Sequence, residues 1–264
     1  MNTIEDFGTQ WTNFQNNTGY YGSIEALISV MGPLLKPEWI RGKRIADIGA
    51  GTGRYTRMFC ELGASDILAI EPSAAFEVLK RNTTDCPNVR YLQATADQVP
   101  PESFDLMCCI GVLQFIPDPV KALKSMGRAL SPAGKLLLWV YGEENNRLYL
   151  TAVKPLRRIT SRLPHRILDR LARFLTIPAL LYGKLCRHPS LPLFQYMRNY
   201  FLRLDSDSRK MVIYDQLNPK LARYYRKEEL YHLLESCGYR NIQMYHRLGY
   251  SWSVLAEYDE IKSR

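Results

Sequence analysis

Asp47-Ile48-Gly49-Ala50-Gly51-Thr52-Gly53 begins at the end of a short apolar run, Arg44–Ile48, and leads into a segment with helical spacing, residues 54–62. Glycines let the backbone approach a ligand closely and adopt dihedral angles that other residues disfavour. A helix that follows such a turn begins with free N–H groups and a partial positive charge, which suit a carboxylate or a phosphate. The stretch therefore predicts a strand, a ligand-binding turn and a helix.

Apolar runs and helical segments alternate along the chain after this turn. The runs are residues 67–70, 89–92, 104–110 and 135–141, with helical spacing at 74–81 and 119–130. Later, residues 226–236 fit a helix that Gly238 ends, and residues 241–246 and 251–257 fit two strands joined by a hairpin at 247–250. Short apolar runs separated by helices indicate βαβ units. We predict an α/β fold with a Rossmann-like doubly wound sheet, mostly parallel with an antiparallel last strand, and a helical cap insertion.

Four regions follow from this pattern. Residues 1–40 are aromatic and lightly charged, and we expect an N-terminal helical lid in which Trp11 and Phe14 face the site. Residues 41–144 form the ligand-binding core, and residues 223–264 complete it with the last helix and two strands. Residues 145–222 lack a strand pattern and are too long for a bare loop in a compact domain. We expect this basic helical insertion to cap the core.

The spacing of the glycines distinguishes two classes of ligand. A dinucleotide-binding GxGxxG motif that starts at Gly49 needs a glycine at position 54, where this chain has Arg54. The spacing is GxGxG with an acid two residues ahead. It resembles the first motif of the class I S-adenosylmethionine-dependent methyltransferases, of the methyltransferase type 11 kind. A nicotinamide-dependent oxidoreductase on a related sheet is the less favoured alternative.

Four further segments resemble that family in the same order. Glu71 follows the second strand, where a carboxylate can accept hydrogen bonds from both ribose hydroxyls. Residues 92–100 (LQATADQVP) resemble the segment at the adenine edge, and residues 104–115 resemble the motif whose strand ends beside the methyl donor. Residues 131–134 resemble the turn into the fifth strand. The resemblance implies S-adenosyl-L-methionine as cofactor, bound by Asp47, Gly49, Ala50, Gly51, Gly53, Glu71, Thr95, Ala96, Asp97 and Ile110.

The resemblance also implies methyl transfer to an oxygen or nitrogen of a small molecule or a glycan, such as a sugar or lipid-linked acceptor. The donor is already activated, so the protein mainly positions the reactants and supplies a base for the acceptor's proton. Ligands of open α/β sheets lie at the carboxyl ends of the strands. The candidate catalytic residues are therefore Tyr141 after the fifth strand, His246 at the end of a later strand, and Asp215, where the insertion returns to the core.

Two features of this chemistry stay open at the level of sequence. No His, Cys or acidic cluster has metal-ligand spacing, so we expect a metal-independent enzyme. The sequence does not identify a side chain as the base, so a non-catalytic S-adenosylmethionine-binding module is a second alternative. Residues 245–252 and the insertion weakly resemble methyltransferases of bacterial surface-glycan pathways, which places glycans among the acceptors to consider.

Positive charge is concentrated in the insertion. Residues 145–215 hold 14 Lys and Arg and four acids, a net +10, against +9 for the whole chain. Arg162, Arg166 and Arg170 recur every four residues opposite an apolar stripe, which predicts one basic amphipathic helix. Such a face fits an anionic membrane or a diphosphate-bearing substrate. Nucleic acid is disfavoured because no aromatic residues interleave with the stripe to stack bases.

The remaining composition bears on location. The N-terminus lacks a signal-peptide pattern, and the six cysteines show no CxxC spacing. The strongest apolar stretches fall short of the ~20 residues that span a bilayer. We expect a cytoplasmic protein, at most peripheral to the inner membrane face.

Overall fold

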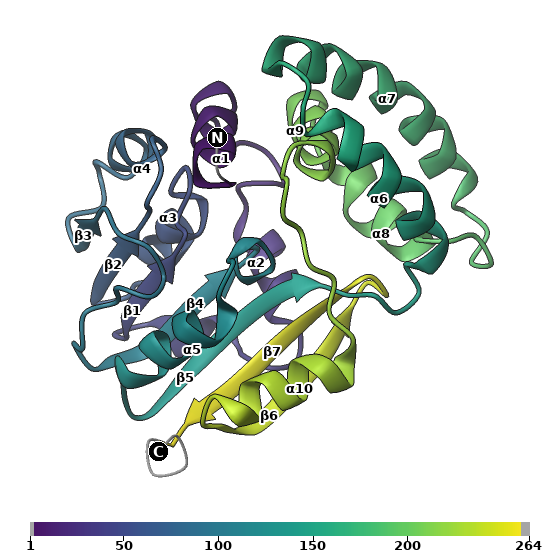
Figure 1. Cartoon of the computed structure of the whole chain (residues 1–264). Helices are drawn as coiled ribbons and strands as arrows, with labels where there is room; N and C mark the ends of the chain where they lie inside the picture. The colour runs from purple at the N-terminus through teal and green to yellow at the C-terminus, as the bar shows by residue number, and fades with distance from the viewer. Residues whose placement is uncertain (1–2, 260–264) are drawn as a thin grey trace.

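The computed structural model describes residues 3–259, in which seven strands form one twisted sheet (Figure 1). Their order across the sheet is β3-β2-β1-β4-β5-β7-β6, and β7 alone among them runs antiparallel to its neighbours β5 and β6. The predicted fold class is thereby confirmed. The strands are β1 (Arg44–Ile48), β2 (Asp66–Ile70), β3 (Val89–Leu92), β4 (Phe104–Ile110), β5 (Leu130–Tyr141), β6 (Tyr239–Arg247) and β7 (Ser251–Tyr258).

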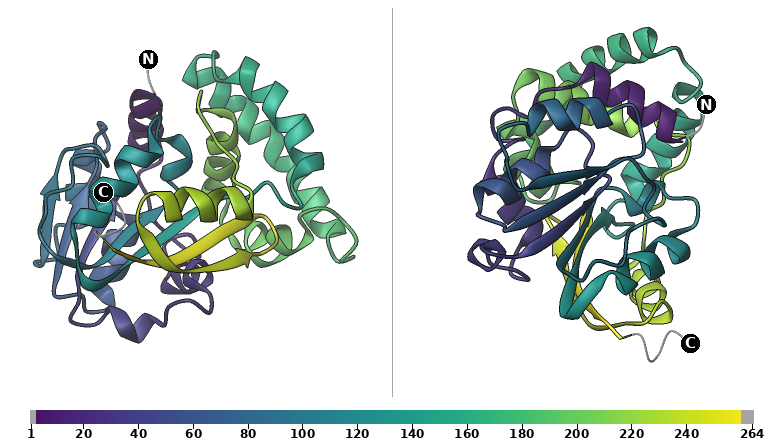
Figure 2. Two further views of the ribbon diagram at one scale, coloured as in Figure 1. Left: turned by 60° about the horizontal axis from the view of Figure 1, so that its bottom comes forward. Right: turned by 90° about the vertical axis from the view of Figure 1, so that its left-hand side faces the viewer.

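Helices cover both faces of the sheet (Figure 2), because the central strands are apolar on both sides. Ala46 of β1 packs in a core with α5 and α10, whereas the neighbouring Ile45 packs in a second core with α2 and α3. Strands buried on both faces are typical of parallel sheets. The covering helices are α2 (Ile24–Met31), α3 (Arg54–Glu61), α4 (Phe76–Asn82), α5 (Pro119–Arg128) and α10 (Lys227–Ser236), with short 3-10 turns η1 (Pro37–Ile40) and η2 (Leu113–Phe115).

The two N-terminal helices occupy different places in the fold. Helix α1 (Thr3–Asn13) stands over the carboxyl ends of the strands, next to the insertion (Figure 1). Helix α2 instead buries Leu27, Val30 and Met31 against the sheet. Only the first helix therefore lies where a lid over the sheet would lie.

The insertion forms a helical layer above the end of β5 (Figure 1). Helix α7 packs on α9 through Leu168, Ala172, Tyr214 and Leu217. None of the helices within residues 3–259 is both long enough and apolar enough to cross a bilayer. The elements of this layer are α6 (Arg147–Thr160), α7 (His165–Leu185), α8 (Phe194–Asn199), η3 (Phe201–Arg203) and α9 (Ser206–Leu217).

The prediction of one helix carrying Arg162, Arg166 and Arg170 is wrong. Helix α6 ends at Thr160 and α7 begins at His165, so Arg162 lies in the turn between them. Pro164 immediately precedes α7, a position where its missing N–H leaves no hydrogen bond unmade. Arg166 and Arg170 lie on α7 and are exposed.

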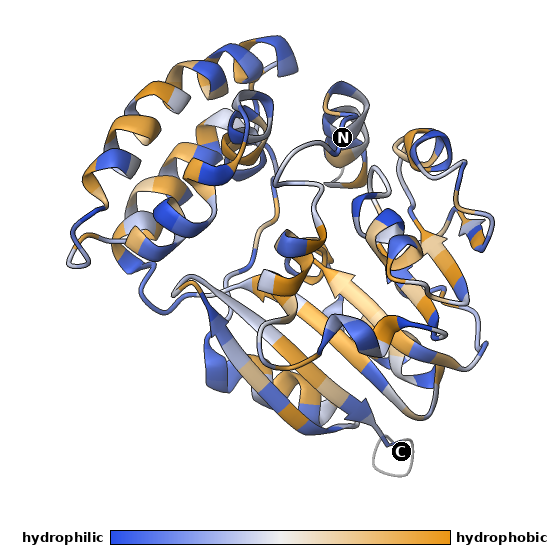
Figure 3. Ribbon diagram, turned by 180° about the vertical axis from the view of Figure 1, so that it is seen from behind, coloured by the Kyte–Doolittle hydropathy of each residue, from blue (hydrophilic) through white to orange (hydrophobic). Residues whose placement is uncertain are grey.

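The predicted apolar stripe of this segment is also divided. Leu168 is buried against α9, but Ile167 is 49% exposed and Phe174 is 66% exposed. Helix α7 therefore exposes both apolar and basic side chains, and the two kinds alternate along it (Figure 3). The side that it buries is narrower than the sequence spacing indicated.

Candidate active site

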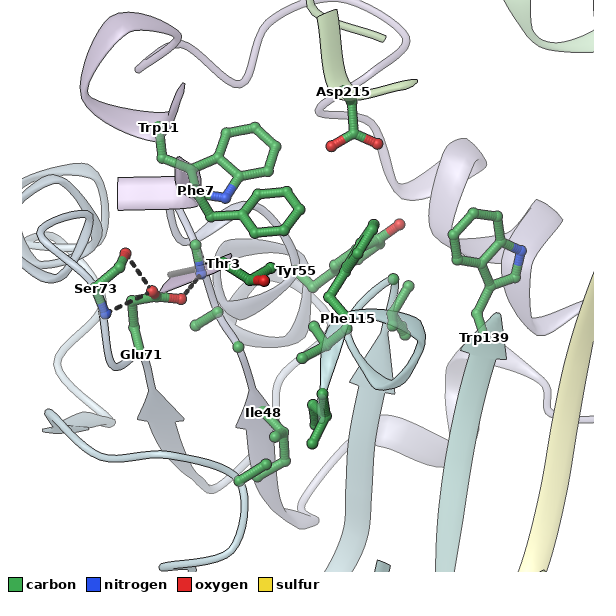
Figure 4. A pocket seen from close by; sticks show the side chains of 18 of the residues that line it. Thr3, Phe7, Trp11, Ile48, Tyr55, Glu71, Ser73, Phe115, Trp139 and Asp215 are labelled. Carbon is green, nitrogen blue, oxygen red and sulfur yellow. Dashed lines mark hydrogen bonds between the residues drawn. The ribbon is translucent and has the colours of Figure 1, made fainter. Parts of the chain in front are cut away.

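A cavity of about 770 Å³ lies at the carboxyl ends of β1, β2, β4 and β5. Helix α1 and helix α9 contribute its upper wall, as Phe7, Trp11 and Asp215 in Figure 4 show. Ligands of open α/β sheets bind at this edge. We therefore expect the functional side chains to line this cavity.

The glycine turn brings backbone to the cavity wall. Gly49, Ala50 and Gly51 line the cavity, and Gly49 has a φ of 68°. A Cβ atom at Gly49 would lie 2.6 Å from Cγ2 of Val112, so a side chain there would collide with the strand-end loop. Gly53 does not line the cavity; with a φ of 81° it turns the chain into α3.

Glu71 is the carboxylate that faces the cavity beside this turn. It is 5% exposed, and its Oε2 accepts a hydrogen bond from the Gly51 N–H (2.8 Å). Its Oε1 accepts from the Ser73 N–H (3.0 Å) and the Ser73 hydroxyl (2.5 Å; Figure 4). These bonds fix the carboxylate, and Oε2, which accepts one bond, keeps a second lone pair. Glu71 can therefore accept a hydrogen bond from a ligand hydroxyl at Oε2.

Asp47 does not line the cavity. Its carboxylate is buried and accepts a hydrogen bond from the Thr56 hydroxyl (2.6 Å), which joins the end of β1 to α3. Burial raises the pKa of Asp47 to about 6, and the bond from Thr56 opposes this rise. The structure therefore places Asp47 behind the turn, where it positions the turn, rather than in contact with a ligand.

Residues at the predicted adenine edge do line the cavity. Thr95, Ala96 and Asp97 lie in its wall, as does Ile110 at the end of β4. Asp97 pairs with Lys121 (2.6 Å) and accepts a hydrogen bond from the Thr95 hydroxyl (2.5 Å). Lys121 first, and Thr95 second, lower the pKa of Asp97. The carboxylate thus stays ionised in the wall.

Tyr141 and Asp215 meet at the opposite side of the cavity. The Tyr141 hydroxyl donates to Asp215 Oδ2 (2.7 Å), and Gln10 Nε2 donates to Asp215 Oδ1 (3.1 Å). Gln216 Nε2 in turn donates to the Tyr141 oxygen (2.8 Å). Burial raises the pKa of Asp215, while the bonds from Tyr141 and Gln10 oppose the rise. The carboxylate of Asp215 points into the cavity (Figure 4).

His246 is not brought to the cavity. Its ring stacks on Trp252 with 4.3 Å between centroids, and its Nε2 is buried without a partner. Burial lowers its pKa, so the ring is mostly neutral near neutral pH. Side chains alternate along a strand, and it is the neighbouring Arg247 that lines the cavity.

The two aromatic residues expected in a lid separate in the structure. Trp11 lines the cavity and stacks with Phe7, whose ring packs on Phe115 (centroids 4.6 Å apart). Phe14 instead packs on Tyr214 of the insertion. Phe7, which the sequence did not single out, takes the place expected of Phe14.

Sequence reasoning also missed the aromatic and basic lining of the far half of the cavity. This half includes Trp139 of β5 and two arginines, Arg54 and Arg247. The run Phe194–Asn199 and the hairpin are rich in aromatic residues, but nothing in their spacing indicates a shared wall. The tyrosines that line this half are Tyr21, Tyr55, Tyr196, Tyr200 and Tyr250.

Comparisons with known proteins agree with this geometry. Residues 46–138 match a family model described as a methyltransferase domain. The chain is 29% identical over 140 residues to the ubiquinone biosynthesis O-methyltransferase of Pseudomonas aeruginosa, covering 49% of this chain and 60% of that protein. It is 33% identical over 112 residues to the tRNA U34 carboxymethyltransferase of Campylobacter hominis, covering 40% of this chain and 39% of that protein.

A solved structure shares the fold. Human N-acetylserotonin methyltransferase in complex with S-adenosylmethionine superposes with a TM-score of 0.54 and 16% identity, over 96% of this chain and 56% of that one. The match to a methyltransferase model disfavours the nicotinamide-dependent alternative. Residues 46–138 therefore form a class I, Rossmann-like S-adenosylmethionine-dependent methyltransferase domain, whose cofactor is S-adenosylmethionine.

Proposed function

We propose that this chain transfers a methyl group to a hydroxyl oxygen of a small-molecule acceptor, with Asp215 as the base. One observation carries the proposal: the half-buried carboxylate of Asp215 faces the cavity that the glycine turn and Glu71 also line. The similarity to an O-methyltransferase over about half of the chain supports an oxygen acceptor.

The residues of the near half fit S-adenosylmethionine. A Cβ at Gly51 would extend toward the Trp11 indole, to 3.5 Å from its Nε1. Because glycine has no Cβ, the space between the turn and the indole stays open to a ligand that passes close to the backbone. Glu71 would accept a hydrogen bond from the ribose at Oε2, and Thr95, Ala96 and Asp97 would border the adenine. When bound, the cofactor supplies a methyl group on a positively charged sulfur, which is already an activated electrophile.

Asp215 can take the proton that the acceptor hydroxyl loses as its oxygen gains the methyl group. The Tyr141 and Gln10 bonds hold the carboxylate in one orientation, and the raised pKa makes it a stronger base than an exposed aspartate. Burial also raises the pKa of Tyr141 well above its ordinary value, so the phenol stays protonated. We therefore propose that Tyr141 positions Asp215 and that His246, outside the cavity, takes no part.

The test is methyl transfer to a panel of phenols, amines and glycans, with labelled S-adenosylmethionine and a metal chelator present. We expect turnover of a phenol that survives chelation, because no described residues gather three His, Cys, Asp or Glu side chains to hold a metal. Asp215→Asn should lower kcat by about 10²–10⁴-fold, since an amide cannot accept the proton. The acid limb of kcat/KM should lie above the ordinary aspartate value of 3.8.

Asp207→Asn is the matched control, because this exposed acid lies on the same helix. Full activity in Asp215→Asn would remove the base from the proposal. Labelling of amines or glycans in place of phenols would reassign the acceptor, and loss on chelation with rescue by Mg²⁺ or Zn²⁺ would contradict metal independence. Binding without turnover of any acceptor class would favour a non-catalytic module.

We also propose that the outer face of α7 contacts an anionic membrane. Five apolar residues on this face are between 49% and 66% exposed, and Arg166, Arg170 and Lys184 are exposed with them. At 100° per residue these side chains share one side of the helix, and a mixed apolar and basic face suits a bilayer interface. The apolar residues are Ile167, Phe174, Ile177, Leu181 and Leu185.

A further inference from the structure

Arg247 lines the cavity with an unsatisfied guanidinium group. It ends β6 and is 2% exposed. Its Nε donates to the Ser29 carbonyl oxygen (2.9 Å) and the Ser29 hydroxyl (3.1 Å), and its Nη1 donates to the Tyr250 hydroxyl (2.8 Å). Its Nη2 is buried without a hydrogen-bond partner.

Arg54 is a second such group in the same wall. It begins α3, and its guanidinium carbon lies 3.8 Å from the ring centroid of Tyr21 and 4.4 Å from that of Tyr55. Its Nε is likewise buried without a partner. Within residues 3–259, no ion pair joins either arginine to a carboxylate.

The tyrosines around these arginines do not neutralise them. Burial raises the pKa of Tyr250 to about 12, and it raises those of Tyr21, Tyr55 and Tyr196 as well. These phenols are therefore uncharged near neutral pH, whereas arginine stays protonated. Buried charges in proteins are usually paired. Two guanidinium groups without a carboxylate partner in the cavity wall therefore indicate that an anionic ligand binds there.

The position of Arg247 assigns that anion to the acceptor half of the cavity. Arg247 reaches the cavity wall from the β6–β7 hairpin, where it donates a hydrogen bond to Tyr250. Its guanidinium carbon lies 5.2 Å from the ring centroid of Tyr200 in the insertion. The residues proposed for the cofactor lie at the ends of β1, β2, β3 and β4, and in the sheet order β5 and β7 stand between these strands and β6. The Tyr55 ring beside the Arg54 guanidinium (4.4 Å) and the Tyr200 ring beside that of Arg247 (5.2 Å) line the same cavity.

We propose that the acceptor carries a carboxylate or phosphate group that binds the guanidinium groups of Arg247 and Arg54, which line the cavity. This rests on the proposed function, because it names the class of acceptor that enters the same cavity. The apolar and aromatic wall, with Phe115 and Trp139, would receive the body of the molecule. Arginine is suited to both anions, since its planar fork matches their oxygens.

The test is calorimetric titration of the full chain, saturated with S-adenosylhomocysteine, with benzoate, phenyl phosphate and the neutral benzamide. S-adenosylhomocysteine has the same amino-acid carboxylate as the cofactor, so any cofactor need for an anion site is already met. We expect one of the anions to bind about tenfold or more tightly than benzamide, the scale of one hydrogen bond to a charged group. The stronger of the two anions identifies a carboxylate or a phosphate source.

Arg247→Met should reduce this preference to about the level of benzamide while the affinity for S-adenosylhomocysteine stays unchanged. Arg54→Met is the second variant should Arg247→Met not fold, and it should reduce the preference in the same direction. Arg57→Met is the matched control, because Arg57 lies on the same helix but pairs with Asp85 at 2.9 Å on the surface.

Equal binding of benzamide and both anions by the unaltered chain would overturn the proposal. So would arginine variants that keep the preference, or that weaken S-adenosylhomocysteine instead of the probes, since the arginines would then serve the cofactor. The binding measurement needs no turnover. Asp215→Asn should keep the anion preference while losing activity, so a failure of the anion site is distinguishable from a failure of the proposed base.

Discussion

Asp47 and Glu71 show what a motif can and cannot reveal about a single residue. Each acid stands at or just after the end of a strand, and the resemblance assigned both to the cofactor. The structure turns Glu71 into the cavity and Asp47 toward Thr56 of α3. Spacing predicts which strand end an acid occupies. The direction of its side chain depends on packing with residues of the following helix, which the motif does not contain.

Thr56→Val tests the structural role of Asp47. Thr56 is fully buried, and valine keeps its shape but removes the hydroxyl that donates to the carboxylate. We expect the free energy of unfolding near neutral pH to fall by about 1–3 kcal/mol. Because the folded-state pKa of about 6 exceeds the ordinary 3.8, the stability that the protonated carboxyl provides is lost as pH rises through about 6.

The loss in Thr56→Val should therefore be largest near neutral pH and smaller at about pH 4.5, where the carboxyl is mostly protonated. Urea unfolding at both pH values measures it. Thr151→Val is the control, since this exposed threonine on α6 bonds only the Leu148 carbonyl oxygen. An equal loss at both pH values would show that Asp47 is not the group affected.

Glu71→Ala tests the ligand-facing acid. Removing the carboxylate should weaken binding of S-adenosylmethionine by about 1.5–3 kcal/mol, the scale of hydrogen bonds to a charged group. Calorimetry measures this, with Glu77→Ala on α4 as control because Glu77 is exposed and pairs only with Lys80. Nicotinamide dinucleotides should give no heat of binding. Unaltered affinity in Glu71→Ala would take Glu71 out of the site.

At the scale of elements, strands and hairpins were predicted more closely than the breaks between helices. The hairpin at residues 247–250 forms as expected, since Leu248 and Gly249 both adopt positive φ, at 49° and 70°. Strand β5 begins at Leu130, earlier than expected, because Phe104 already pairs with Leu130 ahead of a bulge. In the insertion, arginines four apart continue across the turn at residues 161–164, and this continuity concealed the end of α6.

The outer face of α7 yields a prediction at this scale. Arg166, Arg170 and Lys184 changed together to Gln should weaken co-sedimentation with anionic liposomes. At about 1 kcal/mol for each basic residue, the expected loss is about 3 kcal/mol, or more than a hundredfold. Lys36, Arg41 and Arg128 changed to Gln form the control, because they are exposed and lie outside the insertion. Unaltered chain that ignores anionic liposomes at low salt would refute the membrane contact.

At the scale of the molecule, the two halves of the cavity differ in how far sequence could predict them. The cofactor half is made by turns that directly follow consecutive strands, so contiguous motifs describe it. The acceptor half joins residues that are far apart in the sequence. Tyr141 lies 74 positions from its partner Asp215, and Gln10 lies 205 positions from Asp215. Such pairs form only when α1 and α9 pack over the sheet, and no local pattern specifies that packing.

The same long-range contacts predict that ligand binding closes α1 over the cavity. Asn218 of the chain beyond α9 donates to the Asp6 carbonyl oxygen (3.2 Å) and to Gln10 Oε1 (3.1 Å), while Trp11 stands over Gly51. If α1 must open to release the cofactor, a ligand at a hundred times its Kd adds about 2.7 kcal/mol to the free energy of that opening.

Amide exchange in Thr3–Asn13 should then slow by up to about a hundredfold with S-adenosylhomocysteine. Trp11→Ala should lose most of this protection, whereas Trp39→Ala, which contacts Lys43 away from the cavity, should keep it. Exchange in α1 that is the same with and without ligand would mean that the helix is a fixed wall and that the cofactor enters by another route.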